Sequence, residues 1–190
     1  MKPIKNIVFD LGAVLIDWNP IYVFKNEFDT PEELAYFFNE ICTVDWNENQ
    51  DAGYPLDQAT EDLIACYPNH ASKIRMFYDR WEEMLGDAIP GSVDVLRNCV
   101  EDPELKVLAL TNWSAETFPI ALRKFPFLQW FEGIVVSGEE KTQKPFLAIY
   151  KTLLSRYKLK AEETLFIDDN LRNIEAAMSL GIRGLQFKSP

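Results

Sequence analysis

The chain has 190 residues, of which 47% are hydrophobic, so it can bury a sizeable globular core. Its 30 acidic and 19 basic residues give a net charge of -11, and Lys and Arg form no cluster. This balance argues against nucleic acid or an anionic membrane as a partner and is better suited to a metal cation.

The first predicted element is a short buried strand over residues 7–9. Three consecutive apolar residues follow Asn6, and Asp10 stands where the strand would end. Open parallel sheets bind ligands beyond the carboxyl ends of their strands. Asp10 is therefore the first candidate site residue.

Residues 20–86 have helical spacing without a predicted strand. Thr30, followed by Pro31 and Glu33, predicts a helix that runs to about residue 42. Residues 46–53 are polar and turn-like. A helix should follow from Pro55.

A third helix should complete this helical insertion. Asn69 can cap it, apolar residues recur at helical spacing up to Leu85, and Gly86 should end it. The stretch then has the character of a small helical bundle.

From residue 88 onward, short helices alternate with short apolar strands. The strands are predicted at 107–110, 134–136, 165–167 and near 185–187. This alternation is typical of an α/β fold with a Rossmann-like, three-layer parallel sheet. We therefore expect an α/β core of residues 1–16 and 88–190, with a helical cap of residues 17–87.

Polar residues stand at or just after four predicted strand ends. In chain order they are Asp10, Thr111 with Asn112, Lys144, and Asp168 with Asp169. A carboxylate can act as a nucleophile, a hydroxyl and a backbone N–H can hold an anionic oxygen, an ammonium can neutralise charge, and paired acids can hold Mg²⁺. Transfer of a phosphoryl group to an aspartate requires this set.

These segments resemble those of the haloacid dehalogenase-like hydrolases, most of which are Mg²⁺-dependent phosphatases. The matching stretches are FDLGAVLID, LALTN, QKPFLAIY and LFIDDNLRNIEAA, in the family's order. The resemblance covers nearly the whole chain and extends in detail to bacterial sugar-phosphate phosphatases with a helical cap after the first motif. It implies a hydrolase that cleaves a small phosphate monoester through an aspartyl-phosphate, with a sugar phosphate as one candidate class.

The resemblance also implies roles for individual residues. Asp10 would attack phosphorus, while Thr111 and the backbone N–H of Asn112 would bind the transferring oxygens. Lys144 would balance charge. The residues that would hold Mg²⁺ are Asp10, the carbonyl of Gly12, Asp169 and, through water or by orienting its neighbour, Asp168, with support from Asn173.

Gly12 is the main departure from the family's pattern. Phosphatases of the family carry a second Asp two residues after the nucleophile, and this Asp protonates the leaving alcohol and later activates water. Such general acid-base help contributes ~100- to 10,000-fold. Its absence predicts slow turnover, a preference for good leaving groups, or a substitute acid, for which Asp17 is one candidate.

Other functions stay open at this stage. The alternatives are a metal-independent 2-haloacid dehalogenase and a phosphate-binding regulatory protein with little turnover. Trp18 and Trp113 each follow a motif and are candidates for lining the substrate pocket. Cys42, Cys66 and Cys99 have neither disulfide nor zinc spacing, so we expect reduced core thiols in a cytoplasmic protein without a membrane span.

Overall fold

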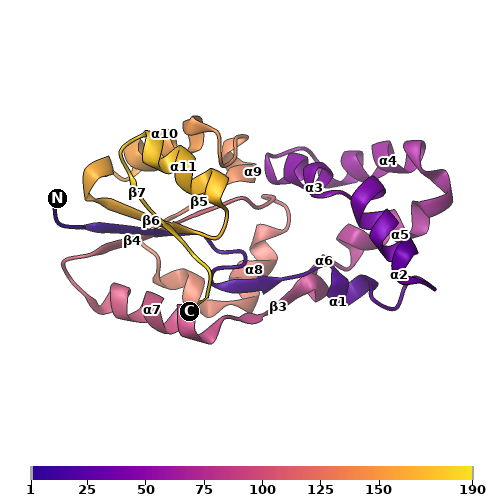
Figure 1. Cartoon of the computed structure of the whole chain (residues 1–190), viewed down its shortest axis with the longest axis horizontal. Coiled ribbons are helices and arrows are strands. Elements are labelled where there is room, and N and C mark those ends of the chain that lie inside the picture. The colour runs from indigo at the N-terminus through magenta and orange to yellow at the C-terminus, as the bar shows by residue number, and fades with distance from the viewer. Residues whose placement is uncertain (1, 190) are drawn as a thin grey trace.

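A five-stranded parallel sheet forms the centre of the computed structural model, which describes residues 2–189 (Figure 1). Its strand order is β5-β4-β1-β6-β7. The strands are β1 (Asn6–Phe9), β4 (Lys106–Thr111), β5 (Ile134–Val136), β6 (Thr164–Asp168) and β7 (Arg183–Gln186). The predicted strands and the α/β fold class are confirmed.

Helices cover both faces of this sheet. Ile7 and Phe9 belong to the larger apolar cluster, with Leu96 and Ala121, whereas Val8 packs into the second cluster. Alternate residues of β1 therefore face opposite layers, which is why the strand is apolar throughout. The covering helices are α7 (Pro90–Glu101) and α8 (Phe118–Lys124) on one face, and α10 (Leu147–Arg156) and α11 (Leu171–Ser179) on the other.

Short elements complete this half of the molecule. They are α9 (Ser137–Glu140) and the 3-10 turns Pro126–Trp130 and Ala161–Glu163. Helix α9 follows β5 directly and lies beside α3 (Val44–Asp51) of the helical insertion (Figure 1).

The insertion contains more elements than its sequence predicts. They are β2 (Ile16–Trp18), α1 (Ile21–Phe24), α2 (Pro31–Tyr36), the π-helix Phe37–Ile41, α3 (Val44–Asp51), α4 (Leu56–Cys66), the 3-10 turn Pro68–His70, α5 (Ala71–Asp79), α6 (Trp81–Met84) and β3 (Leu85–Ala88). The antiparallel pair β2-β3 carries the chain into and out of the helices. Our division into a cap of residues 17–87 and a core of 1–16 with 88–190 stays a proposal.

The capped helix at residue 31 is confirmed. The Thr30 hydroxyl accepts a hydrogen bond from the Glu33 N–H, and the Glu33 carboxylate accepts one from the Asp29 N–H. The helix continues as the π-helix to Ile41 and ends at Cys42.

The turn-like interpretation of residues 46–53 was wrong, because most of the stretch is α3. Thr43 caps this helix by accepting a hydrogen bond from the Trp46 N–H at 3.1 Å. Trp46 packs edge-on against Phe77 inside the insertion, while Glu48 reaches Arg172 of the core at 3.2 Å. A helix that packs between two parts of the molecule does not need a single apolar stripe. The spacing of apolar residues therefore did not reveal α3.

The third predicted helix also differs from the helices that the structure contains. Asn69 lies inside a 3-10 turn and does not cap α5, and the helix breaks at Arg80. The chain then enters β3 at Leu85 instead of ending a helix there, because pairing with β2 satisfies its backbone.

Two further findings concern the chain as described. Cys42 is buried, but Cys66 is exposed, so the expectation of three core thiols was wrong. Among residues 2–189, no helix combines the length and the hydropathy needed to cross a membrane.

We expect Thr43→Ala to lower the free energy of unfolding by about 1 kcal/mol, because it removes the side-chain acceptor that caps α3. Urea denaturation followed by circular dichroism measures the change. Thr43→Ser keeps the acceptor and serves as the matched control. Equal stability of the Ala and Ser variants would contradict the capping role.

Candidate active site

Asp10 stands just beyond the end of the central strand β1. Phe9, the residue before it, lies opposite Ala109 of β4 and Ile167 of β6. The Asp10 N–H donates to the Ile167 carbonyl at 2.8 Å, and the Asp10 carboxylate accepts a hydrogen bond from the Leu11 N–H at 2.7 Å. The sheet therefore presents this carboxylate between the ends of its two neighbouring strands.

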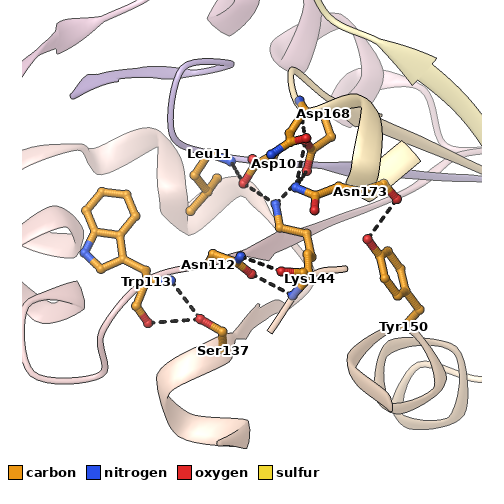
Figure 2. Close-up of polar contacts among 10 residues, drawn as sticks. Asp10, Leu11, Asn112, Trp113, Ser137, Lys144, Tyr150, Asp168 and Asn173 are labelled. Atoms are coloured by element: carbon orange, nitrogen blue, oxygen red, sulfur yellow. Dashed lines mark hydrogen bonds and ion pairs between the residues drawn. The ribbon is translucent and has the colours of Figure 1, made fainter. Parts of the chain in front are cut away.

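Lys144 joins two carboxylates beneath the site (Figure 2). Its Nζ lies 2.8 Å from Asp10 and 2.7 Å from Asp168. Lys144 is 1% exposed, Asp168 is fully buried and Asp10 is 8% exposed. The ammonium thus neutralises one of two adjacent negative charges, and the trio keeps a net charge of -1.

The pKa values of Asp10 and Lys144 are both raised above their ordinary values. The pKa of Asp10 is raised to about 7, mainly because the group is buried; Lys144 opposes this shift and the charge of Asp168 adds to it. Burial lowers the pKa of Lys144, but the two carboxylates outweigh it and raise the pKa overall. A further cation beside Asp10 would therefore favour the ionised, nucleophilic form.

Asp168 is held in place by donors from three directions. Its oxygens accept hydrogen bonds from the Lys144 ammonium, the Asn170 N–H and the Asn173 amide, which reaches both oxygens at 3.0 and 3.1 Å. The backbone carbonyl of Asn173 in turn accepts from Tyr150 at 2.9 Å. With its oxygens already engaged, Asp168 is better placed to orient its neighbours than to bind a cation directly.

Asp10, Asp168 and Asp169 together could hold a metal ion. Each offers a carboxylate oxygen, and these oxygens lie within 4.8 Å of one another. Asp169 is exposed, unlike the other two. Burial and Asp168 raise the pKa of Asp169, as expected for acids crowded without a cation. Hard oxygen ligands of this kind fit Mg²⁺.

The end of β4 brings Thr111 and Asn112 to the same edge. Thr111 is buried, and its hydroxyl has no hydrogen-bond partner within the described part of the chain, so it can donate to an incoming oxygen. The Asn112 amide holds the backbone of Lys144 at both its N–H and its carbonyl, each at 2.9 Å. The sequence did not predict this contact between the Asn112 side chain and the Lys144 backbone, which fixes the position of the loop that carries Lys144 (Figure 2).

Two adjoining cavities open above these residues. The first, of about 170 Å³, is lined by Gly12, Trp18, Trp113 and Asp169, with side chains of the insertion opposite them. The second, of about 500 Å³, includes Asp10, and residues of α3 form part of its wall. Trp18 and Trp113 line the first cavity, and their role in binding a substrate stays a prediction.

Asp17, the candidate substitute acid, lines neither of these two cavities. Its carboxylate accepts a hydrogen bond from the Tyr22 hydroxyl, and it lines a different cavity with Gly86. Two residues that sequence reasoning missed do lie nearby. Ser137 accepts a hydrogen bond from the Trp113 N–H at 2.8 Å, and Asp51 lines both pocket cavities.

The family model for haloacid dehalogenase-like hydrolases matches residues 7–186 of the chain. The chain belongs to this family. It is 29% identical over 187 residues to a sesquiterpene phosphatase of Aspergillus oryzae, a match covering 96% of the chain and 89% of the relative. It is also 24% identical over 186 residues to a phosphorylated carbohydrates phosphatase of Thermotoga maritima, covering 93% and 81%.

The fold is shared with a HAD family enzyme from Bacteroides thetaiotaomicron. One structure of that enzyme matches with a TM-score of 0.75 at 25% identity, covering 99% of this chain and 95% of the other. A second, with magnesium and inorganic phosphate bound, matches with a TM-score of 0.76 at 24% identity, covering 98% and 95%. The family resemblance predicted from the motifs is confirmed, and the chain is a haloacid dehalogenase-like hydrolase.

Removal of the buried ammonium should be costly. We expect Lys144→Met to lower the free energy of unfolding by about 3–5 kcal/mol, because Asp10 and Asp168 would keep their burial without a cation. Urea denaturation measures this loss. The exposed Lys151 provides the control, since Lys151→Met should change stability by less than about 0.5 kcal/mol. A comparable loss in both variants would contradict the role of the ion pairs.

Proposed function

We propose that the chain is a Mg²⁺-dependent phosphatase that hydrolyses a small phosphate monoester through an aspartyl-phosphate. The observation that carries this proposal is the buried Asp10–Lys144–Asp168 trio beside the exposed Asp169. It combines a nucleophile, a fixed positive charge and a place for a hard cation at one strand edge.

In the proposed reaction, the Asp10 carboxylate attacks phosphorus and forms an acyl-phosphate bond as the bond to the leaving alcohol breaks. The Thr111 hydroxyl and the Asn112 N–H donate to the transferring oxygens, and Lys144 offsets the charge gathered at Asp10. These donors are fixed before the substrate binds, so little reorganisation is needed in the transition state.

The cation is assigned to Asp10, the Gly12 carbonyl and Asp169, with Asp168 in support. When bound, Mg²⁺ supplies positive charge that lowers the repulsion between the Asp10 carboxylate and the anionic phosphoryl group. At ~4 Å two like charges repel by about 4 kcal/mol in a partly buried site, so one lysine shared by two carboxylates does not suffice.

The pocket favours a polar substrate of modest size. Its larger cavity, of about 500 Å³, is lined by Thr43, Asn47 and Glu48 as well as by apolar side chains. Hydroxyl and amide groups of this kind can bind sugar hydroxyls. We therefore propose a sugar phosphate as the substrate class, which also suits the similarity to a phosphorylated carbohydrates phosphatase.

We expect Asp10→Asn to abolish phosphate release, because an amide cannot attack phosphorus. The assay is a panel of sugar phosphates and one sesquiterpenyl phosphate with Mg²⁺, in which the wild type releases phosphate. Wild-type activity that survives in Asp10→Asn would overturn the proposal. Release of halide from a 2-haloacid in EDTA, without phosphatase activity, would instead indicate a dehalogenase.

Mg²⁺ should stabilise the folded chain through Asp169. At a concentration about 100 times its dissociation constant, we expect Mg²⁺ to add about 2.7 kcal/mol to the free energy of unfolding and raise the midpoint temperature. Asp169→Asn should lose most of this gain, and EDTA should abolish phosphate release. Equal stabilisation of wild type and variant would contradict the assignment of Asp169.

A further inference from the structure

The wall of the smaller cavity opposite Gly12 carries an unassigned carboxylic acid. Gly12, Asn112 and Asp169 line this cavity from the sheet edge, and Asp51 lines it from the end of α3 in the insertion. Asp51 also lines the larger cavity that contains Asp10. One acid of the insertion therefore faces the space where a side chain at position 12 would act.

We propose that Asp51 is the general acid and base of the reaction, donating a proton to the leaving alcohol and later accepting one from the attacking water. This inference rests on the proposed phosphatase function. It assigns to α3 the two tasks that Gly12, without a side chain, cannot perform.

The backbone around Asp51 is fixed against the core. The Ser137 hydroxyl at the end of β5 donates to the Asp51 carbonyl at 2.5 Å. Two residues further on, the chain runs so close to α9 that a Cβ on Gly53 would lie 2.9 Å from the Gly138 carbonyl oxygen. Ser137 also accepts from the Trp113 N–H, so one hydroxyl joins Asp51 to the loop after β4.

The carboxylate of Asp51 has one side-chain hydrogen-bond partner, and its burial favours the protonated form. The Asn47 amide donates to one of its oxygens at 3.1 Å, and no salt bridge engages it among residues 2–189. The pKa of Asp51 is raised to about 7, mainly because the group is buried; a backbone hydrogen bond from Ser114 and the charge of Lys144 act against this shift, and Glu48 adds to it. An acid near neutrality can both give and take a proton.

Other titratable groups are less well placed. Glu48 lines only the larger cavity, and its carboxylate is engaged in a salt bridge with Arg172 at 3.2 Å. Asp17 lines neither the smaller nor the larger cavity, and its carboxylate accepts a hydrogen bond from the Tyr22 hydroxyl. His70, the one histidine of the sequence, lines another cavity, which belongs to the insertion and contains none of the site residues.

The proton balance closes over two steps. In the first, the bond from Asp10 to phosphorus forms, the ester P–O bond breaks, and protonated Asp51 transfers its proton to the leaving alkoxide to give a neutral alcohol. In the second, ionised Asp51 takes a proton from water as the resulting hydroxide attacks phosphorus. The acyl-phosphate bond breaks, inorganic phosphate leaves, and Asp10 is ionised and Asp51 protonated again.

The test compares leaving groups in Asp51→Asn. Single-turnover rates are measured for 4-nitrophenyl phosphate, whose leaving group needs no proton, and for the sugar phosphate that the wild type hydrolyses fastest. We expect the variant to transfer the aryl phosphoryl group within about threefold of the wild-type rate but to lose ~100-fold or more with the sugar phosphate. With the aryl ester, it should give a burst of about one equivalent and retain the phosphoryl group on Asp10.

Asp45→Asn is the matched control, since it makes the same change at an exposed site in the first turn of α3. It should behave as the wild type with both esters. An equal loss with both esters in Asp51→Asn would indicate a structural role and overturn the proposal, as would no loss at all. Asp51→Ala repeats the comparison if the Asn variant does not fold.

Gly12→Asp provides a rescue. A Cβ at Gly12 would meet no other atom within 4 Å, so the backbone at this position leaves space for a side chain to begin there. In the Asp51→Asn background this substitution should restore turnover of the sugar phosphate at least tenfold, and failure to do so would count against a missing acid. A wild type that releases no phosphate from either ester would overturn the phosphatase function itself, whereas turnover unchanged in Asp51→Asn would overturn only the role of Asp51.

Discussion

The candidate site depends on the two ion pairs of Lys144. At an effective dielectric constant of ~20, each contact below 3 Å contributes a gross attraction of about 6 kcal/mol, set against several kcal/mol for desolvating each ion. The ion pairs therefore need the additional hydrogen bonds that Asp168 accepts from the Asn170 N–H and the Asn173 amide. The Asn112 amide fixes the lysine backbone, so β4 and the loop before α10 are joined to the same network.

Much of this site could be predicted because its residues follow buried strands. Asp10, Thr111 and Asp168 each end an apolar run, and parallel strands bring such ends to one edge. Asp51 could not be found in this way. It ends α3, whose polar sequence lacks an apolar stripe because the helix lies between Phe77 of the insertion and Arg172 of the core.

Ser137 was missed for a related reason. A serine at the start of a short helix has no distinctive spacing, yet its hydroxyl accepts from the loop after β4 and donates to the insertion. Its importance comes from three segments far apart in the sequence, so only the tertiary structure reveals it. The same holds for β2 and β3, which are too short for a clear alternating pattern but stabilise each other by pairing.

The location of Asp51 on the insertion has a consequence for the timing of the reaction. An acid at position 12 would be present whenever the nucleophile is, because both would belong to one loop of the core. An acid at the end of α3 is present only while Ser137 and Gly138 hold that helix against the sheet edge. In the proposed reaction, binding of the substrate by the insertion and delivery of the proton would then be a single event, so a phosphate ester that α3 does not accommodate would also receive no proton.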